Sequence, residues 1–197
     1  MSKINLLALV VLLLSRSASA AVIDFDDLEP FLPVPFDVAA EDDVIVTFAS
    51  SQEGTFAVAP IGSVFATLTN NALVDNDPDL HELEITFSRP ITRIDLLFAL
   101  NTADVSNQLS LNALLGQNIV GSASATGTVP DGFSFPEGRL TFTAGAFDTV
   151  QLSSTAFDFG IDNVTFSVQA VPEPSSLILI STAFAGGAVM LRRRRMV

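Results

Sequence analysis

Polar and hydrophobic residues alternate along the middle of the chain. The clearest alternation begins at Glu82, where polar side chains are interleaved with Leu83, Ile85 and Phe87. A period of two places the apolar residues on one face of an extended strand, the pattern of an antiparallel strand with one side in the core. No segment of the central region shows an apolar stripe of period 3.6 over three turns, so long amphipathic helices are not expected there.

The same pattern predicts about ten short strands separated by turn residues roughly every 8 to 12 positions. Three prolines exclude residues 28–36 from the interior of a sheet, and Gly116, Gln117 and Asn118 predict a hairpin turn. The sequence therefore predicts an all-β domain, an antiparallel β-sandwich or jelly roll. The predicted strands are residues 21–27, 44–50, 55–58, 63–69, 80–88, 91–99, 109–115, 119–125, 139–143, 147–153 and 161–168.

The first 20 residues have the three parts of a secretory signal peptide. Lys3 supplies the positive charge, residues 4–14 form the apolar core, and Ala18 and Ala20 are the small residues of a cleavage site. Cleavage is expected between Ala20 and Ala21, so residues 1–20 are excluded from the predicted fold.

The last 27 residues, 171–197, read VPEPSSLILISTAFAGGAVMLRRRRMV. Residues 175–191 carry no charge, and a helix through them would be about 25 Å long, at the short end of what crosses a bilayer. We expect a single transmembrane helix whose basic end stays in the cytoplasm, which leaves residues 21–170 as the exported domain. The basic end consists of Arg192, Arg193, Arg194 and Arg195.

This tail resembles the sorting signal of the PEP-CTERM family of exported bacterial proteins. The matching features are Pro172, Glu173 and Pro174, the apolar helix and the terminal arginines, in that order. The resemblance implies recognition by an exosortase, a membrane-embedded transpeptidase similar to cysteine proteases, in bacteria that usually make exopolysaccharide. The alternative is a plain single-pass anchor that nothing cleaves; its helix and arginines would look the same.

The body of the chain also resembles the β-sandwich domains common in PEP-CTERM proteins. The resemblance rests on the opening VIDFDD, the VIVTF strand, a strand end from Phe87 to Pro90 and the closing FGIDNVTF. Those domains are similar to carbohydrate-binding modules, so the resemblance implies a sandwich of that kind.

Composition narrows the set of partners. The net charge is −13, and Arg89, Arg93 and Arg139 are the only Lys or Arg residues of the exported part, so nucleic acid and anionic lipid are not expected partners for it. The chain has no cysteine, which excludes disulfides and a Cys-His nucleophile. It also lacks Trp and Tyr, which weakens one common design of sugar-binding site.

A structural calcium ion is the one cofactor that the sequence suggests. In sandwiches of the kind this chain resembles, the first and last strands are often neighbours with a calcium ion nearby. That arrangement would bring Asp162 close to Asp24 or Asp26, and Glu41 or Asp42 would supply a further carboxylate. The alternative is that these acids are solvated charges at strand edges and turns.

Two other groups of residues are weak candidates. Asp75, Asp77 and Asp79 have the spacing that opens an EF-hand loop, but Leu80 stands where the loop needs glycine, so an acidic turn is the better interpretation. His81 is the only histidine, and no second His or Cys is present to complete a zinc site.

We therefore expect a non-enzymatic β-sandwich protein that is exported, held as an inner-membrane precursor, processed by an exosortase, and released to the cell surface or the exopolysaccharide matrix. The sandwich itself would be either a structural matrix protein or a calcium-assisted carbohydrate-binding module. A hydrolase is the third alternative, because pairs of carboxylates are expected by chance among so many surface acids.

Overall fold

A computed structural model describes residues 20–50, 56–75, 82–156 and 158–169. Within these ranges the regular structure consists of strands and one short 3-10 helix, η1 (Glu41–Asp43). The strands are β1 (Ala20–Ile23), β2 (Phe36–Ala39), β3 (Ile45–Ser50), β4 (Phe56–Pro60), β5 (Asn71–Asp75), β6 (Glu82–Leu100), β7 (Gln108–Leu115), β8 (Asn118–Thr126), β9 (Glu137–Ser154) and β10 (Phe159–Val168).

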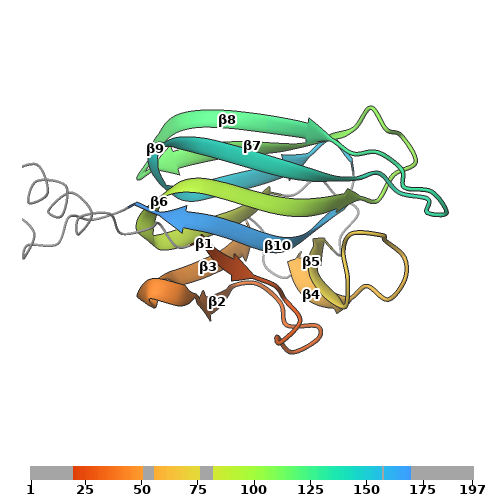
Figure 1. Ribbon diagram of the computed structural model, residues 1–197, viewed down its shortest axis with the longest axis horizontal. Coiled ribbons are helices and arrows are strands. Elements are labelled where there is room, and N and C mark those ends of the chain that lie inside the picture. The colour runs from red at the N-terminus through yellow and green to blue at the C-terminus, as the bar shows by residue number, and fades with distance from the viewer. Residues whose placement is uncertain (1–19, 51–55, 76–81, 157, 170–197) are drawn as a thin grey trace, which may run out of the picture. The chain divides into compact units, whose positions relative to one another are not determined.

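The sheet is folded into two layers that face each other. Two long strands, β6 and β9, run from one layer into the other (Figure 1). The first part of β6 pairs with β3, its later part pairs with β10, and β9 follows it on the other side throughout. The strand order is therefore continuous, β4-β5-β10-β6-β9-β7-β8, and every pairing is antiparallel. In Figure 1, β6 and β10 cross the middle of the domain and β8 runs along its upper edge. The predicted all-β antiparallel sandwich is confirmed.

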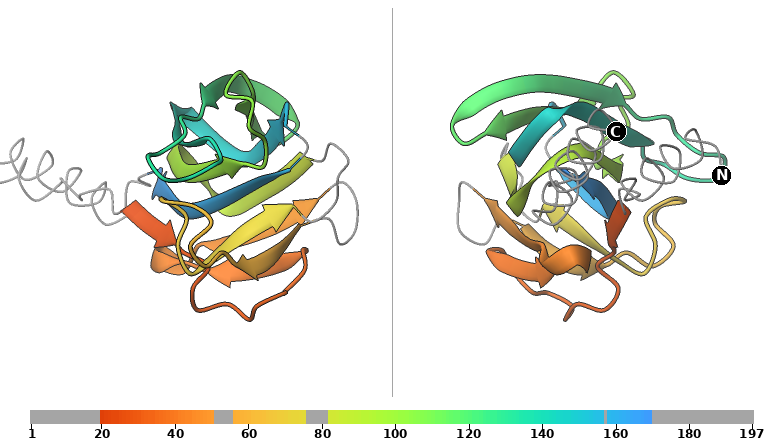
Figure 2. Two further views of the ribbon diagram at one scale, coloured as in Figure 1. Left: turned by 90° about the vertical axis from the view of Figure 1, so that its right-hand side faces the viewer. Right: turned by 60° about the vertical axis from the view of Figure 1, so that its left-hand side comes forward.

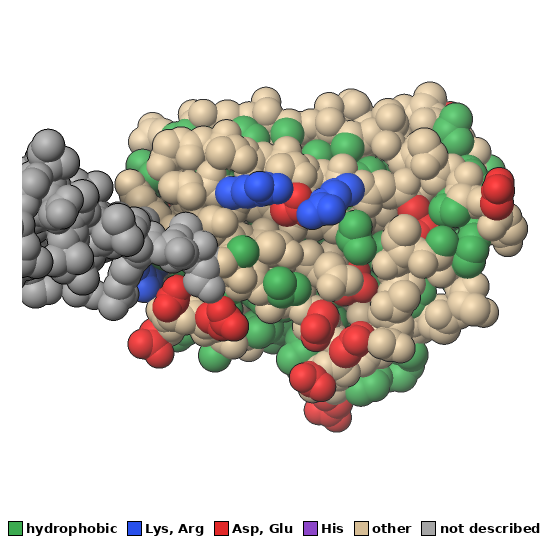
Figure 3. Space-filling model, viewed as in Figure 1, with side chains coloured by type: hydrophobic (Ala, Val, Ile, Leu, Met, Phe, Trp, Pro, Cys, Tyr) green, Lys and Arg blue, Asp and Glu red, His purple; other side chains and the backbone are tan. Residues whose placement is uncertain are grey.

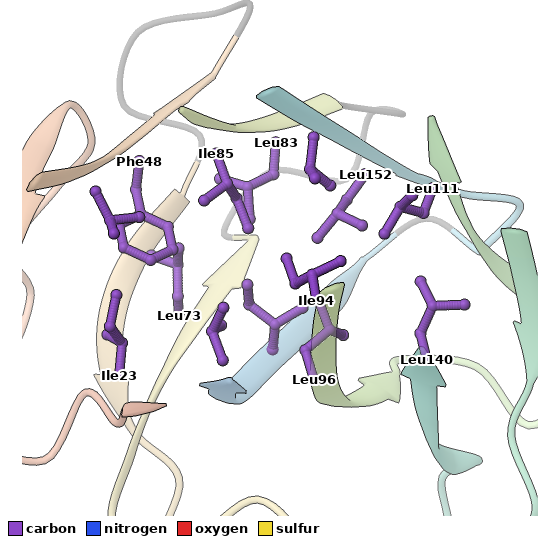
Figure 4. Close-up of a cluster of buried hydrophobic side chains, with 14 of the residues drawn as sticks. Ile23, Phe48, Leu73, Leu83, Ile85, Ile94, Leu96, Leu111, Leu140 and Leu152 are labelled. Carbon is purple, nitrogen blue, oxygen red and sulfur yellow. The ribbon is translucent and has the colours of Figure 1, made fainter. Parts of the chain in front are cut away.

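Side chains from both layers meet in one core. Leu83, Ile85 and Leu152 come from the layer that contains β3 and β7, and Ile94 and Leu140 come from the layer that contains β10 (Figure 4). All five are at most 2% exposed. Burying each side chain of this size stabilises the folded state by about 1.5–3 kcal/mol. The alternating apolar residues seen in the sequence are therefore a main source of the stability of the sandwich.

The segment 61–70 corrects one predicted strand. The sequence pattern placed a strand at 63–69 and a loop at 70–78, whereas the structure has bends and turns at 61–70 and a strand, β5, directly after them. The apolar residues of this segment are buried for a different reason. Ile61 and Leu68 pack with Ala72 and Ala99 in a second cluster, and Phe65 packs against it. We call residues 61–70 the covering loop.

Two further local predictions can be compared with the structure. The predicted strands 80–88 and 91–99 are one bent strand, because Pro90 bends β6 where its partners change instead of ending it. The hairpin at Gly116 is confirmed: Leu115 pairs with Asn118, and Gly116 has a φ of 60°. A positive φ is strained for most residues and easy for glycine, which explains the residue at this turn.

Candidate functional site

The residues predicted to hold calcium lie at the junction of β1 and β10. These two strands are neighbours as predicted, with Ile23 opposite Val164. Asp24 follows β1 directly, and Asp162 lies on β10 next to Asn163, whose φ of 50° accompanies an irregular pairing with β6. The structure therefore brings the start and the end of the folded domain together at these acids.

Asp162 is the most buried of these acids, at 1% exposure. Its Oδ1 accepts a hydrogen bond from the Asn163 backbone N–H at 2.7 Å, and its Oδ2 accepts one from the Thr69 backbone N–H at 3.4 Å. Burial raises the pKa of Asp162, and the nearby carboxylates of Asp26 and Asp24 raise it further, against these two hydrogen bonds. A buried carboxylate with acidic neighbours lowers stability at neutral pH unless a cation offsets it.

The other predicted ligands are partly engaged by protein groups. Asp26 accepts hydrogen bonds from Asn70 Nδ2 at 2.8 Å and from the Asn71 backbone N–H at 3.1 Å. Asp42 lies on η1, where its backbone oxygen accepts from Arg89 at 3.1 Å. Among the residues that the structure describes, no group of three His, Cys, Asp or Glu side chains is arranged to hold a metal ion. Calcium therefore stays a prediction.

A pocket opens beside the covering loop, with a volume of about 340 Å³. Its walls are largely apolar and include the rings of Phe65, Phe135 and Phe159. The Phe65 and Phe135 rings lie 5.6 Å apart between centroids and are tilted by 51°. We call this cavity the loop pocket. Its size and apolar lining are within the range of small-molecule sites.

Three polar side chains also line the loop pocket: Asp75, Asn101 and Asp158. Asp158 Oδ2 accepts a hydrogen bond from Asn101 Nδ2 at 2.8 Å. Asp158 Oδ1 is buried and has no hydrogen-bond partner among the described residues. Buried polar atoms in folded proteins nearly always have a partner, so this oxygen is an exception among the described residues.

Glu137 holds the covering loop in place. It is 4% exposed, and its carboxylate accepts hydrogen bonds from the Ala66 and Thr67 backbone N–H groups at 2.8 and 2.6 Å and from Thr67 Oγ1 at 2.5 Å. This contact positions Phe65 at the loop pocket. Sequence reasoning missed Glu137, because nothing near it in the chain indicates partners 70 and 71 residues away.

Two of the three arginines of the domain flank a buried aspartate on the outer face of the sheet. Arg139 Nε donates to Asp95 Oδ1 at 2.5 Å, and Arg93 Nη2 donates to Asp95 Oδ2 at 3.3 Å. Thr141 Oγ1 donates to the same Oδ2 at 2.7 Å. Figure 3 shows two cationic groups on either side of an acidic one on this face. We call these four residues the arginine cluster.

The electrostatics of the arginine cluster follow from burial. The Asp95 side chain is 6% exposed, whereas those of Arg93 and Arg139 are 53% and 64% exposed. Burial by itself would raise the pKa of Asp95, but hydrogen bonds from Arg139, Thr141 and Arg93, with the charge of Arg139, outweigh it and lower the pKa. The sequence placed Arg93 and Asp95 on one outward face correctly; it gave no sign that Arg139 would join them.

Several predicted residues lie outside the described part of the chain. These include the acids Asp77 and Asp79, and His81. The signal-peptide residue Ala18 is also outside it, whereas Ala20 and Ala21 are the first residues of β1. The predicted sorting and membrane residues also lie outside it: Pro172, Glu173, Pro174, the apolar segment 175–191, and Arg192, Arg193, Arg194 and Arg195.

No helix within the described residues is both long and apolar enough to span a bilayer.

Comparison with protein families gives one match. The family model described as "PEP-CTERM protein-sorting motif" matches residues 170–195. The chain carries a PEP-CTERM protein-sorting motif. The match begins two residues after β10 ends at Val168, so the motif follows the last described strand without overlapping it.

The chain matches no curated protein sequence. Solved structures similar to it include the K2 cleaved adhesin domain of Lys-gingipain, at 12% identity over 77% of this chain and 99% of that one, with a TM-score of 0.48. Another is a carbohydrate-binding module from Cellvibrio mixtus lichenase 5A in complex with cellotriose, at 10% identity over 61% and 92%, TM-score 0.36. A third is the family 11 carbohydrate-binding module from Clostridium thermocellum with a mixed-linked tetrasaccharide, at 11% identity over 80% and 100%, TM-score 0.38.

Proposed function

We propose that this protein is a non-enzymatic component of the cell envelope or the exopolysaccharide matrix, sorted and processed through its C-terminal signal by an exosortase. The sorting motif at 170–195 carries this proposal. Pro172, Glu173 and Pro174 are the recognition element, the apolar segment halts the chain in the membrane, and the arginine block orients it. Because the motif lies beyond β10, cleavage there would leave every described strand intact.

The mass of the mature protein from its producing cells tests this proposal. We expect a chain that begins at Ala21 and has lost Arg192 to Arg195. In the matched variant, Pro172, Glu173 and Pro174 are all replaced by alanine, and the arginines should be retained. If the bulk of the unmodified protein keeps its arginine block, processing by an exosortase is wrong and a plain membrane anchor remains.

Carbohydrate binding is the second candidate function, and the loop pocket favours it. Sugars present apolar ring faces beside hydroxyl groups, so a site for them needs apolar walls with a few polar groups. The pocket provides the rings of Phe65 and Phe135 beside the polar side chain of Asp158. In this chain phenylalanine rings would stack against the apolar face of the sugar, as Trp or Tyr rings often do at such sites.

Binding of the full chain in neutral detergent to a glycan array tests this second candidate. We expect Phe65→Ala to abolish binding of any glycan that the unmodified protein retains. Phe133→Ala is the matched control, because Phe133 lies close in the chain to Phe135 but does not line the pocket. Equal loss in both variants, or no binding glycan at all, would count against carbohydrate binding at this pocket.

Calcium assistance at Asp24, Asp26 and Asp162 has its own test. With calcium bound, millimolar calcium should raise the unfolding midpoint and a chelator should lower it, and Asp162→Asn should remove this shift. No shift on chelation in the unmodified protein would eliminate a calcium site.

The same variant has an expected effect without calcium. Because the pKa of Asp162 is raised in the folded state, folding disfavours the charged form, and the cost is present above the folded pKa. Asp162→Asn should therefore raise the unfolding midpoint at pH 7 in chelator. The gain should fade as the pH falls through the raised folded-state pKa toward the unfolded value of about 3.9, below which the aspartate is protonated in both states. Thermal unfolding at several pH values measures this, and a lower midpoint at pH 7 would contradict it.

A further inference from the structure

Strand β8 is a long edge strand. It pairs with β7 on one side, and its Asn118–Thr126 span ends the strand order of the sheet. Figures 1 and 2 show it at the margin of the domain from three directions. An edge strand presents unpaired N–H and C=O groups, and natural proteins usually protect such an edge with charged residues, proline or a covering element.

Neither charged residues nor proline protect the β8 edge, and its pairing with β7 is regular except for one shift between Gly121 and Ile119. The strand has no charged residue and no proline, and the uncharged stretch extends from Val105 to Pro130. This neutrality stands out in a chain of net charge −13, whose acids lie on both sides of the stretch at Asp104 and Asp131. The β8 edge is therefore free of the like-charge repulsion that the acidic surface would otherwise impose on a second copy.

The side chains along β8 also suit close approach of another backbone. Ser122, Ser124 and Thr126 are exposed and small enough not to cover the edge. At the hairpin end, Ile119 and Val120 are 65% and 42% exposed, an apolar pair that water disfavours. On the inner side, a Cβ at Gly121 would lie 2.7 Å from Phe142, so β8 is packed tightly against the core and keeps its place at the edge.

We propose that β8 pairs antiparallel with β8 of a second copy of this chain, which extends the sheet across a two-fold axis. The occupant follows from charge: the edge offers no acids to a strongly basic partner, whereas two copies of this acidic chain meet with the least repulsion where both are neutral. In an antiparallel pair of identical strands, the same backbone N–H and C=O groups form hydrogen bonds on both copies. A two-fold interface requires this equivalence. The pairing does not depend on how the chain is sorted or on what the loop pocket binds.

A cysteine scan tests the pairing, because the chain has no cysteine of its own. Val120→Cys, Ser122→Cys, Ala123→Cys and Ser124→Cys are each introduced into the full chain, in membranes, and oxidised with copper phenanthroline. Opposed residues of antiparallel strands have Cα atoms about 4.5–5.5 Å apart, within the range of a disulfide. Neighbouring variants are also mixed, so that both registers about a two-fold axis are sampled.

We expect disulfide-linked dimers on a non-reducing gel, with a maximum at one position or one neighbouring mixture and lower yields on either side. Ser63→Cys is the control, since Ser63 is exposed on the covering loop away from β8, and it should remain monomeric. Adding Ser124→Lys to the best-linked variant should reduce the dimer yield at least severalfold. Equal linkage of Ser63→Cys, no linkage along β8, or linkage only to a species of another mass would overturn the proposal.

Discussion

Glu137→Ala is expected to lower the free energy of unfolding by about 2–3 kcal/mol, because hydrogen bonds to a buried charged group are among the more costly to lose. In a domain of this size that corresponds to a fall of roughly 5–10 °C in the unfolding midpoint. The substitution removes the acceptor for two backbone N–H groups and one hydroxyl of the covering loop. Thermal unfolding followed by circular dichroism measures the effect.

Two further variants separate the role of Glu137 from a general effect of charge. Asp131→Ala removes an exposed carboxylate six residues earlier and should change the midpoint little. Glu137→Gln keeps one acceptor oxygen and should fall between the alanine variant and the unmodified protein. A Glu137→Ala midpoint within about 1 °C of the Asp131→Ala midpoint would show that the covering loop does not need this anchor.

Asp95→Ala is expected to destabilise the domain by about 1–3 kcal/mol at neutral pH. The substitution leaves the Arg93 and Arg139 guanidinium groups side by side without the carboxylate between them, and it removes the acceptor of the Thr141 hydroxyl. Both arginines are more than half exposed and can turn toward water, which limits the loss.

The pH dependence of the Asp95 effect has a definite sign. Because the folded-state pKa is lowered, the stabilisation by Asp95 is present above its unfolded value of about 3.9 and is lost as the pH falls through the folded pKa. The difference between the two proteins should therefore shrink in acid. Asp37→Ala is the control, since the Asp37 carboxylate is exposed and accepts a hydrogen bond from Thr47 Oγ1. A difference that stays constant down to pH 2 would contradict the charged pairing.

The alternation of residues predicted the strands of the sandwich well where one face is in the core. Leu83 and Ile85 on β6 and Leu152 on β9 are buried as their period of two requires. The failure at 63–69 has a physical cause. Phe65 and Leu68 are apolar because they cover the outer face of the sheet, and a sequence pattern does not distinguish packing on an outer face from packing in the central core.

Much of the candidate chemistry depends on register, which a single sequence does not specify. Arg93 and Asp95 were predicted to share a face because they lie two residues apart on one strand. Arg139 reaches the same carboxylate only because Leu97 is its partner across β6 and β9. The loop pocket likewise joins residues from Pro60 to Gly160. By contrast, the sorting motif is local in sequence and could be predicted from the sequence alone.

The central place of β10 determines how the domain responds to mechanical load. The sorting motif continues the chain from this strand, and β10 is bonded to β6 on one side and to β1 and β5 on the other. A pull on the tail therefore enters the middle of the sheet and is shared between ladders on both flanks. An edge strand has hydrogen bonds to a neighbour on one side only, whereas β10 has them on both sides. We therefore expect more force to be needed to pull β10 out of the sheet by its C-terminal end.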